Sequence, residues 1–258
     1  MVRRGFFYNK RMPLPRFHCP LALSVGAIID LPAAAARHAC RVLRLREGDW
    51  LTLFDGQRGE YVARIVTTLR EQVGVEIVEW HEVERESRVD ITLVQALQAA
   101  DKMDVTLQKA VELGVTRFVP VASRRSVLKL EGERAERRVA HWRAVAISAC
   151  EQCGRNRLPA IDDVIGLERW LAQPARLATL RLMLAPGAAD NLHSLPPPAD
   201  GACIELLIGA EGGLAPEETA LADAAGFRAI RLGPRVLRTE TAGMAAVAAL
   251  QTLWGDFR

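Results

Sequence analysis

Short apolar runs that alternate with polar positions fill residues 12–82, and Gly, Pro and Asp residues punctuate them. This period-two pattern is typical of half-buried β-strands. Asp55 and Gly56 stand between the runs WLTLF and EYVARI. Because an Asp-Gly pair readily takes the positive φ values of a tight turn, the two runs are predicted to form a hairpin. We therefore expect a small β-barrel or sheet in this part of the chain.

A second pattern starts after a mostly polar stretch at 83–89, which has the composition of an interdomain linker. Over 90–258, apolar strand-like runs alternate with longer segments of helical periodicity. One such segment has apolar residues at helical spacing and ends near Gly114; they are Met103, Leu107, Ala110 and Val111. The alternation predicts an α/β domain with a mainly parallel sheet, whose ligands bind beyond the carboxyl ends of the strands.

The five cysteines are an odd number scattered along the chain, which argues against a disulfide framework. Cys150 and Cys153 form a single CxxC within a predicted long helix. A closed zinc site needs about four ligands, and no second pair follows. We interpret the two as helical core thiols rather than a metal or redox site, and the spacing of the histidines indicates no metal site either.

Composition makes the chain a globular protein, because 50% of the residues are hydrophobic and 25% are charged. No apolar run is long enough to span a bilayer, and the N-terminal stretch MVRRGFFYNKRMPLPR lacks the apolar segment of a secretory signal. We therefore expect a cytoplasmic protein.

Charge is distributed unevenly along the chain. The overall charge is +3, but the first 50 residues carry +6 and the remainder −3. Within this basic segment, His38, Arg41 and either Arg44 or Leu45 recur at roughly helical spacing in HACRVLRLREGD, so one face can carry them. Two interpretations stay open: a contact surface for a polyanion, or an ordinary solvated surface.

One predicted strand runs into a glycine-rich loop, in the stretch IELLIGAEGGLAPEE. Gly209, Gly212 and Gly213 allow a ligand or another backbone to approach, and Pro216 is suited to begin the next helix. The loop fits neither the Walker pattern nor GxGxxG. Glu211 would repel a pyrophosphate, and no lysine stands in the stretch, so a cationic ligand without phosphate, such as S-adenosylmethionine, is favoured.

A second loop of the same kind follows the next predicted strand, in RLGPRVLRTETAG. Gly233 and Pro234 break that strand, Arg235 and Arg238 follow, and Thr239 is predicted to be the N-cap of the closing helix. Two glycine-bearing loops at neighbouring strand ends predict one shared pocket.

Together these two loops resemble the paired signature loops of the SPOUT class of methyltransferases, and in particular the bacterial 16S ribosomal RNA uracil-N3 methyltransferase family. MPLPRFHC and HACRVLRLREGDWLTLFDG are similar to the PUA-like N-terminal domain of that family. LQKAVELGVTRFVPVASRRSV and ISACEQCGRNRLP are similar to its middle segment. The family loop usually reads GPEGG, whereas Ala210 replaces the proline here, which would loosen the turn. Residues 1–11 precede the usual start and form an N-terminal extension.

The resemblance implies a knotted SPOUT domain over 90–258 after a PUA-like β-barrel over 12–82, and a homodimer. It also implies S-adenosylmethionine as the methyl donor and N3 of a uridine near the 3′ end of 16S ribosomal RNA, in the small subunit, as the acceptor. Seven residues would bind the methyl donor or permit its approach: Leu184, Gly209, Gly212, Gly213, Leu232, Gly233 and Leu237.

Roles in the chemistry follow from the acidity of N3–H. We expect an arginine to stabilise the developing uracil anion, Arg238 first and Arg16 second. Glu211 or Glu240 would accept the proton. Each glutamate also has a structural alternative, the helix dipole for Glu240 and loop order for Glu211. The residues expected to touch RNA are Arg16, His38, Arg41 and Arg44.

Two other functions remain open from the sequence. A nicotinamide-dependent oxidoreductase on a doubly wound sheet would also fit the alternation, but the GxGxxG motif is missing. A PUA-like RNA-binding protein that has lost its cofactor would explain the basic segment, but the intact glycine loops argue against it.

Overall fold

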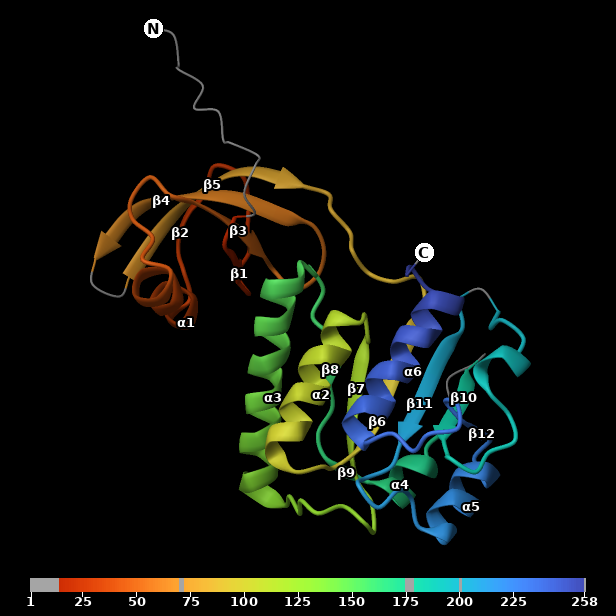
Figure 1. Cartoon of the computed structure of the whole chain (residues 1–258). Coiled ribbons are helices and arrows are strands. Elements are labelled where there is room, and N and C mark those ends of the chain that lie inside the picture. The colour runs from red at the N-terminus through yellow and green to blue at the C-terminus, as the bar shows by residue number, and fades with distance from the viewer. Residues whose placement is uncertain (1–13, 70–71, 175–178, 200, 258) are drawn as a thin grey trace, which may run out of the picture. The chain divides into compact units, whose positions relative to one another are not determined.

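A computed structural model describes residues 14–69, 72–174, 179–199 and 201–257 (Figure 1). The predicted extension 1–11 lies outside these residues. The chain forms two compact units. The first unit contains residues up to Arg85 together with Gly154–Arg157, and the second contains Glu86–Cys153 and Leu158 onward. No pattern in the sequence indicates that these four residues, which follow a long helix, belong to the N-terminal unit.

The first unit is built on a five-stranded mixed sheet with the order β1-β3-β4-β5-β2. Among the described strands of this sheet, only the β1–β3 pairing is parallel. The predicted hairpin is confirmed: β3 and β4 pair in antiparallel fashion on either side of residues 55–59, and Gly56 has a φ of 89°. The strands are β1 (Arg16–His18), β2 (Ile28–Asp30), β3 (Trp50–Phe54), β4 (Glu60–Leu69) and β5 (Gln72–His81).

A short helical segment packs on this sheet and buries its small apolar residues, such as Ala36 and Ala39, against Phe17. It consists of α1 (Ala33–Arg37) and a π-helical turn, η1 (His38–Val42). The helix ends there, and Arg44 has a φ of 56°, in the left-handed region. The prediction that Arg44 continues one helical face with His38 is therefore wrong.

The second unit contains a parallel sheet with the strand order β12-β10-β11-β6-β7-β8, and β9 also pairs with β7. All pairings between its described strands are parallel, which confirms the predicted α/β class. The strands are β6 (Asp90–Ala96), β7 (Arg117–Ala122), β8 (Ala160–Ile161), β9 (Ile165–Gly166), β10 (Leu180–Leu184), β11 (Cys203–Ile208) and β12 (Arg228–Ile230).

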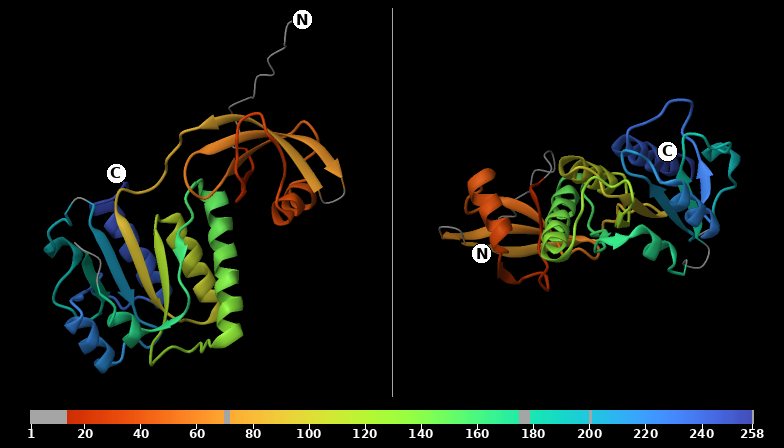
Figure 2. Two further views of the ribbon diagram at one scale, coloured as in Figure 1. Left: turned by 180° about the vertical axis from the view of Figure 1, so that it is seen from behind. Right: turned by 90° about the horizontal axis from the view of Figure 1, so that it is seen from below.

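Helices cover both faces of this sheet. On one face lie α2 (Ala100–Glu112) and α6 (Thr239–Leu253), which pack on each other, with α3 (Gly132–Cys153) beside α2. These helices stand before the sheet in Figure 1 and behind it when the molecule is seen from the back (Figure 2, left). On the other face, α4 (Leu167–Leu171) and α5 (Pro216–Ala224) enclose a core around Trp170 and Phe227. A 3-10 turn, η2 (Leu192–Ser194), follows β10.

Several local predictions are confirmed. The four apolar residues of the predicted helix are buried on α2, and Gly114 follows the helix end with a φ of 86°. Cys150 and Cys153 lie in the last turn of α3 and take part in no disulfide. Pro216 begins α5. Across the described residues, no helix is both long and apolar enough to cross a membrane.

Candidate cofactor pocket

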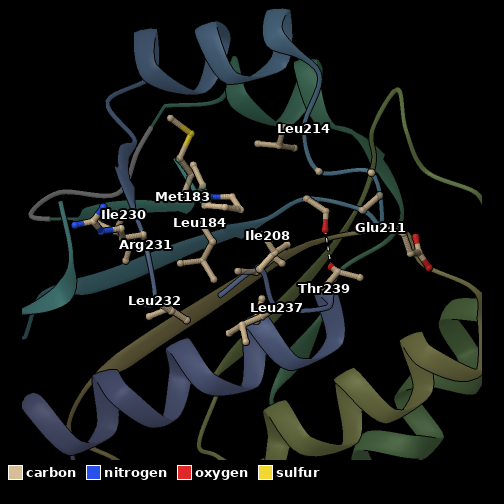
Figure 3. A pocket seen from close by; sticks show the side chains of 18 of the residues that line it. Met183, Leu184, Ile208, Glu211, Leu214, Ile230, Arg231, Leu232, Leu237 and Thr239 are labelled. Carbon is tan, nitrogen blue, oxygen red and sulfur yellow. Dashed lines mark hydrogen bonds between the residues drawn. The ribbon is translucent and has the colours of Figure 1, made fainter. Parts of the chain in front are cut away.

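A cavity of about 450 Å³ lies at the carboxyl ends of β10, β11 and β12. Its floor is apolar: Leu184, Ile208, Leu232 and Leu237 gather in the middle of Figure 3. The structure brings all seven residues that were predicted to bind or admit the methyl donor into the lining. An apolar cavity with a few polar groups at a strand-end crevice is typical of a small-molecule site.

Gly209 is required by the fold of the loop itself. A Cβ atom at this position would stand 2.7 Å from the backbone carbon of Gly213 and 2.8 Å from the nitrogen of Leu214. The loop turns tightly, because the N–H of Gly213 donates to the carbonyl of Ala210 at 2.8 Å. Gly213 has a φ of 71°, which a residue with a side chain rarely adopts. The turn therefore closes with Ala210 in place of the family proline.

Thr239 ties the second loop to the first. Its Oγ1 donates a 2.6 Å hydrogen bond to the carbonyl of Gly209 (dashed in Figure 3). The same hydroxyl accepts from the amides of Gln95 at 3.1 Å and Gln98 at 3.4 Å. The predicted N-cap role is wrong, because Arg238 occupies the N-cap position and no side-chain hydrogen bond caps the helix. The hydroxyl instead joins two loops across the pocket wall.

Arg125 secures the outer part of the glycine loop. Its Nη1 donates to the carbonyl of Gly212 at 2.6 Å and to that of Leu214 at 3.2 Å. The residue follows β7 and also lines the cavity. These two bonds restrain the carbonyls of Gly212 and Leu214 and so fix the path of residues 212–214.

Glu211 lines the cavity at its edge, at the right of Figure 3. Its Oε1 accepts the backbone N–H of Ala99 at 3.2 Å, just before α2. The Nζ atom of Lys102, in the first turn of α2, lies 3.9 Å from the same oxygen. The stretch itself contains no lysine, but the fold brings Lys102 of another element beside Glu211. Because Lys102 lies beside it, the charge of Glu211 does not by itself favour a cationic ligand.

Glu240 and Arg238 do not line the cavity. Oε1 of Glu240 lies 3.7 Å from Lys102 Nζ, and its buried Oε2 has no hydrogen-bond partner among the described residues. Arg238 is exposed, whereas Arg235, three residues earlier in the loop, lines the cavity together with Arg125 and Arg231. The arginines that line the cavity thus do not include Arg238, the first choice made on sequence.

Arg16 is held inside the N-terminal unit. Its Nη1 pairs with Glu60 at 2.5 Å, and its Nη2 donates to the side chain of Asn156 at 2.6 Å and to the carbonyl of Gly154 at 3.2 Å. The guanidinium also stands over the Phe54 ring, 5.2 Å from its centroid. Its side chain is only 13% exposed. These contacts explain how the segment Gly154–Arg157 is anchored to the first unit.

The other residues expected to touch RNA lie on the surface of that unit. His38, Arg41 and Arg44 are all exposed. The His38 ring packs edge-on against Phe17 with centroids 5.6 Å apart. Arg44 follows the π-helical turn with left-handed backbone, a conformation that often marks a functional position.

Three supporting groups were missed from the sequence: Lys102, Arg125 and the Gln95–Gln98 pair. Gln95 lies near the carboxyl end of the mostly apolar strand β6, Gln98 follows that strand, and Arg125 follows the next parallel strand. The rule that ligands bind at strand ends could therefore have identified all three. No comparable signal exists for Lys102, because only the packing of α2 beside the glycine loop places it there.

Two family models match the chain. The model described as RNA methyltransferase domain covers residues 85–251, and that described as RNA methyltransferase PUA domain covers residues 31–77. A curated relative from Buchnera aphidicola (strain Sg), named ribosomal RNA small subunit methyltransferase E, is 31% identical over 94% of this chain and 98% of its own length. The relative of the same name from Mycobacterium bovis is 31% identical over 92% of this chain and 91% of its own.

Solved structures agree with these relatives. Ribosomal RNA small subunit methyltransferase E from Neisseria gonorrhoeae, bound to S-adenosylmethionine, is 42% identical, with a TM-score of 0.88 over 95% of this chain and 100% of that one. A methyltransferase from Legionella pneumophila with bound S-adenosylmethionine is 35% identical, with a TM-score of 0.91 over the same shares. The two glycine-bearing loops, the two-unit fold and these matches agree, and the chain belongs to the ribosomal RNA small subunit methyltransferase E family.

Proposed function

We propose that this protein transfers the methyl group of S-adenosylmethionine to N3 of one uridine near the 3′ end of 16S ribosomal RNA. The observation that carries the proposal is the gathering of all seven predicted donor-binding residues around one apolar cavity at three parallel strand ends. Relatives of the same family are named for methylation of small-subunit RNA. The site chemistry supports the same conclusion.

The cavity fits the methyl donor in its size and in its polarity. Leucine side chains from three strand ends form an apolar surface on which an adenine ring can pack, and the nearby loop backbone offers hydrogen-bonding groups. Gly209 and Thr239 keep the two loops together around that space. When bound there, S-adenosylmethionine supplies an electrophilic methyl group, and the residues of the chain fix its orientation.

The acceptor end of the reaction needs a proton acceptor and a cation. N3 of uracil loses its proton as it gains the methyl group, and Glu211 is the carboxylate that lines the cavity. Arg235, which lines the cavity, and Arg238, which is exposed beside it, are placed to meet the negative charge of the uracil and of nearby phosphates. Glu240 is a weaker candidate for the proton because it does not line the cavity.

The exposed residues His38, Arg41 and Arg44 of the first unit would contact the RNA backbone, since arginines bind phosphate groups strongly. Arg16 would have a structural role there because its guanidinium is committed to Glu60 and Asn156. A homodimer acting on the small subunit in the cytoplasm completes the proposal, and sedimentation of the purified chain would test the dimer.

Calorimetric titration tests the donor part of this function. We expect S-adenosylmethionine to bind and NADH not to bind, and the donor to raise the melting temperature of the protein. Binding of NADH alone would favour the oxidoreductase alternative. Absence of binding for both ligands would favour an RNA-binding protein without a cofactor.

A further inference from the structure

A second cavity, of about 240 Å³, is formed in the second unit by the loop after β7 and the first half of α3. We call its six lining residues the basic hollow: Leu128 and Leu130 from the loop, and Arg134, Arg137, Arg138 and His141 from the helix. The four helical residues recur at spacings of three or four, so they share one face of α3. Among the described residues that line the hollow, none is acidic.

Two arginines of the hollow are available to a ligand. Arg134 is exposed and forms no ion pair or hydrogen bond within the part of the chain that the structure describes. Arg137 pairs with Glu133 at 3.1 Å, but the two side chains are 73% and 84% exposed, and such a surface pair is weak in water. Glu131 and Glu136 are close in sequence but do not line the hollow. Both guanidinium groups can therefore exchange their present contacts for a stronger acceptor.

Asp104 of α2 holds the other two polar side chains of the hollow. Its Oδ1 accepts the indole N–H of Trp142 at 3.0 Å, and its Oδ2 lies 2.8 Å from Nε2 of His141. Nη1 of Arg138 lies 3.8 Å from Oδ1, which is beyond hydrogen-bond distance. Three arginines thus share two carboxylates, Asp104 and Glu133, and the hollow keeps a net positive charge.

The hollow lies at the same end of the sheet as the cofactor pocket. In Figure 1 the loop after β7 runs along the lower edge of the second unit to the first turn of α3, and β11 points toward that edge. Arg125 of this loop lines the cofactor pocket and binds the carbonyl of Gly212, whereas Leu130 lines the hollow. Because an extended chain spans at most about 3.6 Å per residue, the Cα atoms of Arg125 and Leu130 are no more than about 18 Å apart.

This separation and this charge suit a nucleic-acid strand. A stacked strand advances about 3.4 Å per nucleotide, so a strand with one base in the pocket reaches about 18 Å away within about five nucleotides. Guanidinium groups bind phosphate oxygens through paired, charge-assisted hydrogen bonds. The leucines of the hollow can support the aliphatic parts of the arginine side chains.

We propose that the basic hollow binds backbone phosphates of the substrate RNA, several nucleotides from the target uridine, through Arg134 and Arg137. This inference rests on the proposed function, which makes RNA the substrate. The contact fixes the register of the strand relative to the cofactor pocket and carries no base specificity, because phosphate groups are the same at every nucleotide.

The test measures binding of the full chain to a protein-free fragment from the 3′ end of 16S ribosomal RNA at several salt concentrations. The variants are Arg134→Gln, Arg137→Gln and the double variant, in which glutamine removes the charge and keeps a good helix former. We expect each single variant to reduce by about 1 the slope of log affinity against log salt concentration, and the double variant to reduce it by about 2. The double variant should also bind the fragment about 10-fold more weakly.

Arg143→Gln is the matched control, because it removes the same charge from the same helix. Arg143 is exposed, pairs with Asp163 at 3.1 Å and does not line the hollow. The slope for R143Q should equal that of the wild type. In all these variants the melting temperature should be unchanged and the Kd for S-adenosylmethionine should stay within about 2-fold, since the substituted residues do not line the cofactor pocket.

Three results would overturn the inference. The slope could stay unchanged in the double variant, or R143Q could lower it as much as R134Q, which would mean a general effect of charge. The variants could also bind the protein-free fragment normally and lose affinity only for assembled small subunits, which would mean that the hollow contacts a ribosomal protein. Failure of the proposed function is distinguishable, because the wild-type protein would then transfer no methyl label to small subunits, whatever the binding comparison gives.

Discussion

Thr239 Oγ1 donates a 2.6 Å hydrogen bond to the carbonyl oxygen of Gly209. Both residues are buried, and they belong to different loops of the pocket. A hydrogen bond between buried groups is expensive to remove from one side, because the remaining carbonyl then lacks a partner. This hydrogen bond connects the two glycine-bearing loops of the pocket.

Replacing Thr239 with valine should therefore weaken donor binding. Valine matches threonine in shape but leaves the Gly209 carbonyl without this donor and the Gln95 amide with only its bond to the Ala96 carbonyl, at a cost of about 1–3 kcal/mol in folding free energy. We expect a lower melting temperature and an affinity for S-adenosylmethionine reduced by about 10-fold. Denaturation and calorimetry measure the two effects.

Thr252→Val is the control for that substitution. Thr252 is an exposed residue of the same helix, and its hydroxyl donates to the Ala248 carbonyl one turn earlier, at 2.9 Å. The control should bind the donor as the wild type does. Equal donor affinities in T239V and T252V would contradict the bridging role of Thr239.

Gly209→Ala should disrupt the pocket more severely. The added Cβ would lie 2.7 Å from the Gly213 backbone, so the loop must open to admit it. We expect calorimetry to detect no donor binding by G209A while the circular dichroism spectrum stays native. At Gly166, an added Cβ meets nothing within 4 Å and φ is −62°, so G166A should bind normally. Normal donor binding by G209A would refute this account of the loop.

The sequence was sufficient to predict the fold class and the pocket because both depend on local patterns. Strand periodicity located β10, β11 and β12, and their glycine-bearing ends are local in the chain. Parallel strands bring their carboxyl ends to one edge, which places the two glycine-bearing loops together although β10 separates β11 from β12, so the expectation that these two strands are neighbours is wrong. The places of Leu184, Leu232 and Leu237 were implied by the resemblance alone.

The remaining features depend on packing between distant segments. Lys102 reaches Glu211 only because α2 packs beside the glycine loop, and Thr239 bonds to Gly209 rather than capping its own helix. Arg16 was predicted to act on the uracil from its residue type, but Glu60 and Asn156 surround it with acceptors. Residue type alone did not separate a ligand-binding arginine from a structural one. The knot implied by the resemblance stays a prediction.

Arg44 offers a test of RNA contact by the first unit. If its exposed guanidinium binds a phosphate group, Arg44→Ala should reduce by about 1 the slope of log affinity for small-subunit RNA against log salt concentration. Arg64→Ala is the comparison, because Arg64 pairs with Glu76 across β4 and β5 at 3.1 Å. A slope unchanged in R44A would exclude a phosphate contact by Arg44.

Glu60 should make the first unit sensitive to acid. Burial raises the pKa of Glu60, but hydrogen bonds from Arg85 and Arg16 outweigh this effect and bring the pKa below its ordinary value. Because the pKa is lower in the folded state, the stabilisation is complete above the unfolded pKa of about 4.3 and is lost as the pH falls through the folded pKa.

Hydrogen exchange in β3, β4 and β5 between about pH 6 and pH 2 would measure this loss after correction for intrinsic exchange rates. The difference in opening free energy between the wild type and Glu60→Gln should shrink as the pH falls. Glu76→Gln removes a more exposed carboxylate, 39% accessible, and should show little such change. A difference for E60Q that stays constant with pH would contradict the linkage.

The most direct measurement of the central claim is mass spectrometry of small-subunit RNA after incubation with the purified protein and methyl-deuterated S-adenosylmethionine. Subunits from cells that lack the enzyme supply an unmodified acceptor, and G209A supplies the matched negative control. We predict one deuterated N3-methyluridine near the 3′ end of 16S ribosomal RNA, absent with G209A. A label on another atom, or no label despite donor binding, would contradict the account.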